Sequence, residues 1–114
     1  PRNIPLTIKY AELEISYGDP KKAHEILLDL FNNKIPTPYQ IRLIANAANN
    51  AGEKAEAFSY MAEFYLSIGN FQEAIEQLKI ALTMKPITNI QKAKFIARLN
   101  EIEQYLDEMN KNRR

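Results

Sequence analysis

The sequence predicts an all-α protein, a stack of about six antiparallel helices, and three observations lead to this prediction. Apolar residues recur at the spacing of one helical face in most segments, whereas no segment alternates as a strand does. Proline residues and capping side chains stand where helices would begin or end. The three glycines, at 18, 52 and 69, lie 34 and 17 residues apart. These signals delimit helices at about 5–17, 20–32, 38–51, 54–68, 71–84 and 88–110.

The expected helix ends have a recognisable chemistry. Asp19-Pro20 and Thr37-Pro38 each place a capping side chain before a proline at the first helical position. Thr88 can cap the last helix in the same way. Pro36 and Pro86 cannot continue the helices that precede them. Each glycine follows a helical segment, where we expect a residue in the left-handed conformation to end the helix.

The segment 55–88 has the residue pattern of one complete tetratricopeptide (TPR) repeat, a helix–turn–helix unit of 34 residues. Alanines at 62, 74 and 81 allow two antiparallel helices to approach closely, while Phe58 and Tyr65 fill the space between them. Gly69 marks the turn between the two helices. We therefore expect a TPR-like α-solenoid, in which each helix packs mainly on its neighbours along the chain.

The same face pattern recurs 17 residues earlier, over 41–48, which gives a second repeat at 38–71. Helix 54–68 then belongs to two overlapping repeats and should be buried on two sides. Ten of the fourteen residues from 55 to 68 are apolar or aromatic, as a helix covered on both sides requires. Phe64 and Tyr65 should consequently face different neighbours.

The two ends of the array are less regular. We assign 4–37 as a first repeat, although Glu14 replaces the usual aromatic residue and Leu30 replaces an alanine. Helix 88–110 should cap the array with one apolar face, formed by Ile96, Leu99, Ile102, Leu106 and Met109. The 114 residues form a single domain, and we expect them to be a piece of a longer protein, because the chain begins at Pro1 without Met.

The composition argues against several classes of function. A net charge of +1 creates no strong field for nucleic acid or a membrane surface. The absence of cysteine excludes disulfides and thiolate metal sites. No apolar run approaches the length of about 18 residues that a membrane span needs.

No catalytic or metal-binding motif is recognisable either. His24 begins the string "HEILL", but the second histidine of a zinc protease motif would stand at 28, which is a leucine. Ser16, Ser59 and Ser67 lie within expected helices and have no His–Asp pair to activate them. We therefore expect no catalytic, cofactor or metal site in this chain.

A TPR array binds its partners through the concave face lined by the first helices of its repeats. The residues expected on that face are Tyr39, Arg42, Asn46, Asn49 and Asn50 in the middle repeat, and Glu56, Ser59, Glu63, Leu66 and Ser67 in the last. Arg42 and Asn46 resemble half of the carboxylate clamp of chaperone-binding TPR domains, but Glu56 and Tyr60 stand where further basic residues belong. Peptide or protein docking, a carboxylate clamp and a plain solvated surface are the three interpretations of this face.

The runs "EAFSYMAEFYLSIGNFQEAIEQLKIAL" (56–82) and "QKAKFIARLNEIEQYL" (91–106) resemble the C-terminal TPR tail of bacterial periplasmic zinc metalloproteases of the β-barrel assembly-enhancing family. The run "LTIKYAELEISYGDPKKAHEIL" (6–27) is similar to another stretch of that tail. The resemblance implies a periplasmic parent protein with an HExxH zinc protease domain upstream of these residues. The tail would bind that domain and the outer-membrane assembly machinery or its substrates, without a catalytic or zinc-binding residue of its own. The alternative is a TPR scaffold or co-chaperone module from an unrelated protein.

Overall fold

A computed structural model describes residues 4–32 and 34–113, and these residues form six α-helices and no strand. Residues 1–3, 33 and 114 of the expected domain lie outside this description. The helices are α1 (Ile4–Tyr17), α2 (Pro20–Leu30), α3 (Pro38–Asn50), α4 (Lys54–Ser67), α5 (Phe71–Thr83) and α6 (Asn89–Asn112). The all-α prediction is confirmed, and every expected helix is present with both ends within two residues of the expected position.

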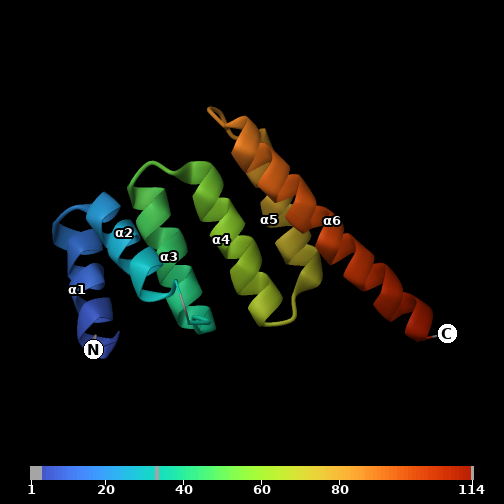
Figure 1. Ribbon diagram of the computed structural model, residues 1–114, viewed down its shortest axis with the longest axis horizontal. Coiled ribbons are helices and arrows are strands. Elements are labelled where there is room, and N and C mark those ends of the chain that lie inside the picture. Colours follow the sequence, from blue (N-terminus) through green and yellow to red (C-terminus); the bar gives the residue numbers. More distant parts are fainter. Residues whose placement is uncertain (1–3, 33, 114) are drawn as a thin grey trace.

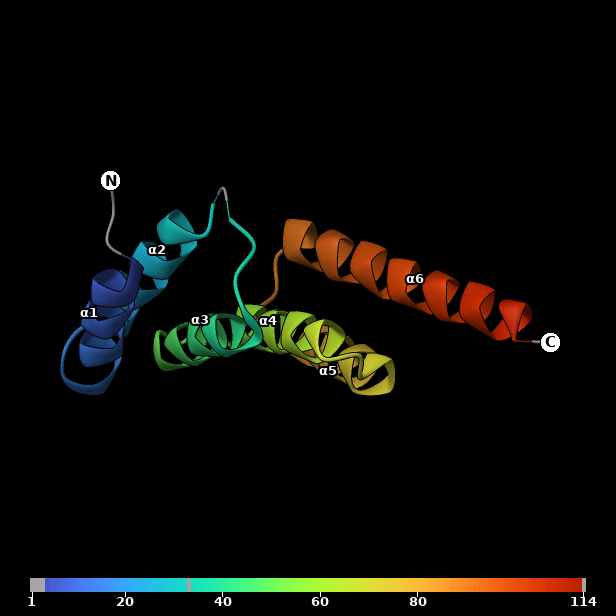
Figure 2. The ribbon, with the colours of Figure 1, turned by 90° about the horizontal axis from the view of Figure 1, so that it is seen from below.

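The helices run alternately up and down and follow one another in chain order from one end of the molecule to the other (Figure 1). Each helix packs against its neighbours in the sequence, and α4 packs against both α3 and α5. Seen at right angles, α3, α4 and α5 lie in one layer, while α2 and α6 rise on the same side of it at opposite ends (Figure 2). The molecule is therefore curved rather than flat.

The expected caps are formed by the residues that the sequence indicates. The Thr37 hydroxyl accepts a hydrogen bond from the Gln40 amide (3.2 Å), and the Gln40 side chain accepts one from the Thr37 amide (2.9 Å). Thr88 and Gln91 form the same reciprocal pair, with both distances at 3.0 Å. The Asp19 carboxylate accepts from the Lys21 amide at 3.0 Å. These bonds satisfy amide groups that the first turn of a helix leaves without partners.

The glycines do not all behave as expected. Gly52 and Gly69 have positive φ angles of 85° and 80°, as predicted, but Gly18 is not in the left-handed region, so the prediction is wrong there. The reason lies in Glu14, whose carboxylate accepts a hydrogen bond from the Asp19 amide at 3.1 Å. Because this side chain satisfies the amide that follows the helix, the turn between α1 and α2 closes without a left-handed residue.

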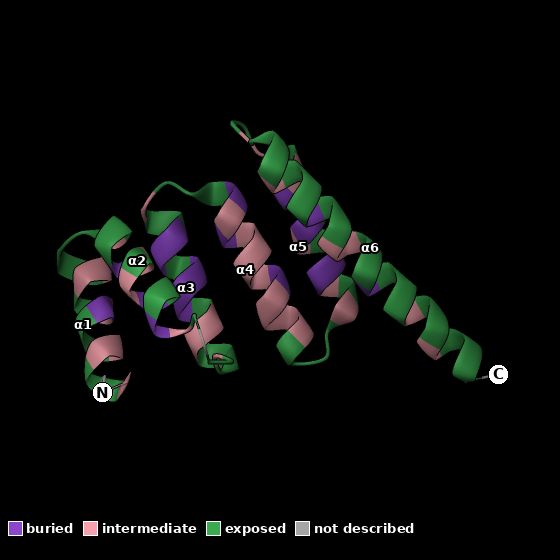
Figure 3. Ribbon diagram, in the orientation of Figure 1, coloured by how far each residue is buried: buried purple, intermediate pink, exposed green. Residues whose placement is uncertain are grey.

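Figure 3 shows where buried residues lie along the helices, and most of the buried apolar ones belong to two clusters, one in each half of the chain. The N-terminal cluster joins α1, α2 and α3 around Ala11, Ala23, Leu27, Leu43, Ile44 and Ala47. The C-terminal cluster joins α4, α5 and α6 around Ala55, Ala62, Ala74, Ile75, Leu78, Ala81, Phe95 and Ile102. Tyr65 packs against the C-terminal cluster, whereas the Phe64 ring lies beneath Arg42 of α3. The two aromatic residues thus face different neighbours, as the sequence predicts.

The apolar face of α6 differs from the expected one by a single residue. Phe95 is 1% exposed and Ile102 is 3% exposed, with Leu99 and Leu106 partly buried beside them. Ile96, which the sequence assigns to this face, is 39% exposed, so that assignment is wrong. Phe95, Leu99, Ile102 and Leu106 follow one another at i, i+4, i+7 and i+11, so a phenylalanine begins the buried stripe.

Candidate functional site

A groove of about 740 Å³ opens along α3, between α1 and α4. We call it the first groove. Its polar lining consists of Glu12, Ser16, Tyr39, Arg42, Asn46 and Asn49, and its apolar lining of Ile15, Leu43, Ala45, Ala57, Phe58 and Met61. Four residues of the expected partner-binding face therefore line one groove. They are the α3 members of that face other than Asn50.

The periodicity of α3 explains this arrangement. Tyr39, Arg42, Asn46 and Asn49 recur at i, i+3, i+7 and i+10, which aligns them along one side of the helix. Ile44, Ala47 and Ala48 are buried on its other sides, which holds α3 in place. The reciprocal Thr37–Gln40 cap fixes the start of the helix and with it the position of Tyr39.

Tyr39 closes one end of the first groove by a contact with α1. Its hydroxyl donates a hydrogen bond to the Glu12 carboxylate at 2.6 Å. This bond, made by the protonated hydroxyl, raises the pKa of Tyr39 above its usual range. Both side chains lie near the surface, and the bond links the first and third helices across the rim of the groove.

Arg42 adds a positively charged residue to the lining of the first groove. Its guanidinium lies over the ring of Phe64, with the central carbon 5.5 Å from the ring centroid, which is the geometry of a cation–π contact. Among the described residues, no carboxylate forms an ion pair with Arg42. The guanidinium is therefore held in position and keeps its donors for an anionic or carbonyl ligand.

The three asparagines of α3 have separate roles. Asn50 donates to the backbone oxygen of Asn46 (2.8 Å) and to its side-chain oxygen (2.9 Å), so it closes the end of the helix and does not line the groove. Lys54 donates to the side-chain oxygen of Asn49 at 2.8 Å. These bonds occupy the amide oxygens of Asn46 and Asn49 and leave their amino groups as possible donors to a ligand.

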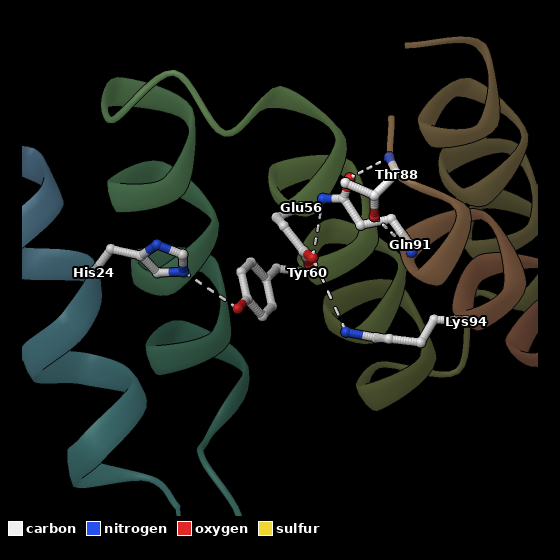
Figure 4. Close-up of polar contacts among 6 residues, drawn as sticks. All are labelled: His24, Glu56, Tyr60, Thr88, Gln91 and Lys94. Atoms are coloured by element: carbon white, nitrogen blue, oxygen red, sulfur yellow. Dashed lines mark hydrogen bonds and ion pairs between the residues drawn. The ribbon is translucent and has the colours of Figure 1, made fainter. Parts of the chain in front are cut away.

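Two α4 members of the expected face, Glu56 and Glu63, point elsewhere, towards α6. Arg98 binds Glu63 in a bidentate manner, with distances of 2.9 and 2.8 Å. Gln91 donates to Glu56 at 3.3 Å, and Lys94 lies 3.9 Å from the same carboxylate (Figure 4). Ser59 is partly buried and lines neither groove. Glu56 and Glu63 therefore join α4 to α6 rather than surround the first groove.

A second groove, of about 640 Å³, lies on the other side of α3 and α4. Its lining comes from α2, the segment after it, α3, α4 and α6: Leu28, Phe31, Asn32, Ile35, Pro36, Ile41, Ile44, Tyr60, Glu63, Leu66, Ser67 and Arg98. In Figure 2 this is the concave side between α2 and α6, so the α3 residues expected on a concave face line the groove on the opposite side instead. Glu63, Leu66 and Ser67 of the expected face line this second groove, so the expected binding residues are divided between two sides of the molecule.

His24 and Tyr60 link α2 to α4 beside the second groove (Figure 4). The His24 Nε2 atom and the Tyr60 hydroxyl lie 3.2 Å apart, and the two rings meet edge to face at 5.6 Å. Burial lowers the pKa of His24, although the Glu56, Glu53 and Glu25 carboxylates act in the opposite sense. Burial, with a further contribution from Glu56 and Glu53, raises the pKa of Tyr60 to about 12. A neutral histidine paired with a tyrosine is a packing contact between helices.

One sequence signal could have indicated the contacts between α4 and α6. Glu56–Gln91 and Glu63–Arg98 are both separated by 35 residues, close to the expected repeat length. The pairs also share a spacing of seven residues on each helix, so they lie two turns apart. No comparable signal in the sequence points to the contact of Arg42 with Phe64.

Comparison with protein families, with curated proteins and with solved structures found no match for this chain. Within the described residues, no group of three or more His, Cys, Asp or Glu side chains is placed to hold a metal ion. None of the described helices is both long enough and apolar enough to cross a membrane.

Proposed function

We propose that this chain is a non-catalytic protein-interaction domain that binds a peptide segment of a partner protein in the first groove. The observation that carries the proposal is the position of Arg42, a positively charged side chain without an ion-pair partner above an apolar groove floor. The amino groups of Asn46 and Asn49 add neutral donors beside it. Phe58 and Met61 offer apolar surface to a side chain of the ligand.

The ligand that suits this lining is a peptide with a carboxylate or backbone carbonyl next to an apolar side chain. A guanidinium pairs well with a carboxylate, because the two planar groups can form two parallel hydrogen bonds. Asparagine amino groups donate well to peptide carbonyls. The nearby Glu12 carboxylate, which already accepts from Tyr39, disfavours a second acidic group at that end of the groove.

Within this proposal the six helices form a TPR-like α-solenoid in which α4 is shared by two repeats. Three features support it: the 34-residue spacing of Gly18 and Gly52, the two-sided packing of α4, and the contacts at 35-residue separation. We further propose, from the sequence resemblance alone, that the domain is the tail of a periplasmic zinc protease that acts in outer-membrane protein assembly.

The binding proposal can be tested by selecting peptides from a random library on the immobilised chain and measuring their affinities by titration calorimetry. Arg42→Glu should weaken a selected peptide by at least about tenfold, the equivalent of about 1.4 kcal/mol, and Asn46→Ala should weaken it less. Lys92→Glu, the same change of charge at an exposed position of α6, is the matched control. Equal affinities for Arg42→Glu and the control would exclude the first groove as the binding site.

The origin of the domain has a separate test. The parent protein's upstream sequence should contain a secretory signal and an HExxH motif if the domain is a protease tail. A parent without them would contradict the protease assignment and favour a scaffold or co-chaperone module, while leaving the binding proposal in place.

A further inference from the structure

The first helix, α1, is apolar on two sides. On its inner side Ile8, Ala11 and Ile15 belong to the N-terminal cluster. On its outer side Tyr10, Leu13 and Tyr17 are 44%, 50% and 88% exposed. These three residues recur at i, i+3 and i+7, and Leu6, which is 68% exposed, precedes them at the same helical spacing. We call Leu6, Tyr10, Leu13 and Tyr17 the outer stripe.

Comparison with α4 shows how a helix with a similar apolar content is packed. Nine of the 14 residues of α4 are apolar or aromatic, and α4 is packed between two helices. Eight of the 14 residues of α1 are of the same kind, but α1 packs only on α2 and α3 and lies at the end of the row of helices (Figure 1). A helix that is apolar on two sides gains stability from a neighbour on each.

We propose that the outer stripe is the interface with a second copy of this chain, in which two α1 helices pack antiparallel about a two-fold axis. The axis would pass beside the midpoint of the stripe, between residues 11 and 12. It would set Tyr10 of each copy against Leu13 of the other, and Tyr17 against Leu6. A two-fold interface uses the same patch on both subunits, and this stripe is self-complementary because its large and smaller side chains face each other.

The charges at one edge of the stripe fit this arrangement. Lys22 of α2 lies over the Tyr10 ring, with its Nζ atom 5.7 Å from the centroid, and the Glu14 carboxylate accepts from the Asp19 amide at the start of the same helix α2. Lys22 and Glu14 therefore lie along the same edge of the stripe. A two-fold axis places this edge against its own copy in the reverse direction, so Lys22 of one chain approaches Glu14 of the other. Opposite charges meet, and the parallel arrangement lacks this pairing.

The exposed area is also in the range that a dimer can use. Tyr10, Leu13 and Tyr17 together expose about 350 Å², taking about 200 Å² for a whole side chain of this size, and Leu6 raises the total to about 500 Å². Contiguous apolar patches of about 300–600 Å² are the largest on most monomers and often serve a function. A stable interface buries about 800 Å² per partner, so the stripe supplies its centre and flanking polar residues the remainder.

The test is the oligomeric state in solution, measured by sedimentation equilibrium from about 5 µM to about 500 µM, the range in which a weak dimer dissociates. The chain should be a dimer at the upper end of this range. Tyr17→Lys and Leu13→Lys should each raise the dissociation constant by at least about tenfold. Both positions are half exposed or more, so circular dichroism should show unchanged helix content. Ile90→Lys, at a 76% exposed position of α6, is the control and should leave the dimer intact.

The charge pairing has its own variant. Lys22→Glu should weaken the dimer at low ionic strength more than Lys21→Glu does, because only Lys22 lies at the stripe. A chain that stays monomeric at the highest concentration would overturn the proposal and leave the stripe to a different protein. A dimer that tolerates both Tyr17→Lys and Leu13→Lys would overturn it as well, since the contact would then lie elsewhere.

Discussion

The position of Phe95 provides a stringent test of how α6 is held on the rest of the protein. Its side chain is 1% exposed within the C-terminal cluster, and α6 has only one other buried residue, Ile102. Phe95→Ala removes a whole aromatic ring from a site that α5 and α4 enclose. Truncation of a buried phenylalanine to alanine costs about 3–5 kcal/mol, from lost burial and from the cavity that remains. Since domains of this size have a stability of about 5–15 kcal/mol, the loss should be large.

The neighbouring residue supplies the control. Ile96→Ala removes aliphatic carbons from a side chain that is 39% exposed, and it should cost about 1 kcal/mol or less. Urea unfolding followed by circular dichroism should therefore separate the two variants by at least about 2 kcal/mol. Equal losses for the two, or a larger loss for Ile96→Ala, would show that α6 is rotated relative to the structure described.

Three further predictions concern backbone, protonation and capping. Gly69→Ala should lower the free energy of unfolding by about 1–2 kcal/mol, because residue 69 has a φ of 80°. Gly18→Ala lacks this backbone cost. Equal melting temperatures for Gly69→Ala and the parent would contradict the left-handed conformation of residue 69. His24 has a lowered pKa in the folded protein, so the unfolded chain binds its proton more readily, and acidification from about pH 7.5 to about pH 5.5 should destabilise the fold. Urea titrations across that range should show a weaker dependence in His24→Gln, and an identical dependence would disprove the role of His24. Thr88→Ala should cost about 0.5–2 kcal/mol through loss of the α6 cap, and a melting curve unchanged from the parent would argue against that cap.

The secondary structure was largely predictable, because its signals are local. Thr37 and Thr88 specify helix starts through bonds that reach only three residues along the chain. Gly69 specifies a turn through its own φ angle. The prediction for Gly18 is wrong because the Glu14 side chain accepts a hydrogen bond from the amide of Asp19. The turn after α1 therefore closes without a residue in the left-handed conformation. Ile96 was assigned to the wrong side because Phe95 and Ile96 are both apolar, and adjacency alone does not show which one faces α5.

The candidate site was predictable only in part. The spacing of Tyr39, Arg42 and Asn46 on one helix indicates a common side, and the structure places them along one groove. The spacing of residues along α3 does not indicate how α4 is rotated about its own axis. Glu56 and Glu63 were grouped with the α3 residues, but Gln91 and Arg98 of α6 bind them on the other side of the molecule.

The sequence by itself determined the number, order and ends of the helices, because capping bonds, glycine conformations and apolar spacing act within a few residues. It also indicated that helix 54–68 would be covered twice, since its composition leaves no purely polar side. Only the tertiary structure decided which faces meet. The partners of Arg42, Glu63 and His24 lie 22, 35 and 36 residues away, and such contacts depend on the rotation of each helix about its axis. That rotation is set by the simultaneous packing of all neighbouring side chains, which no local pattern specifies.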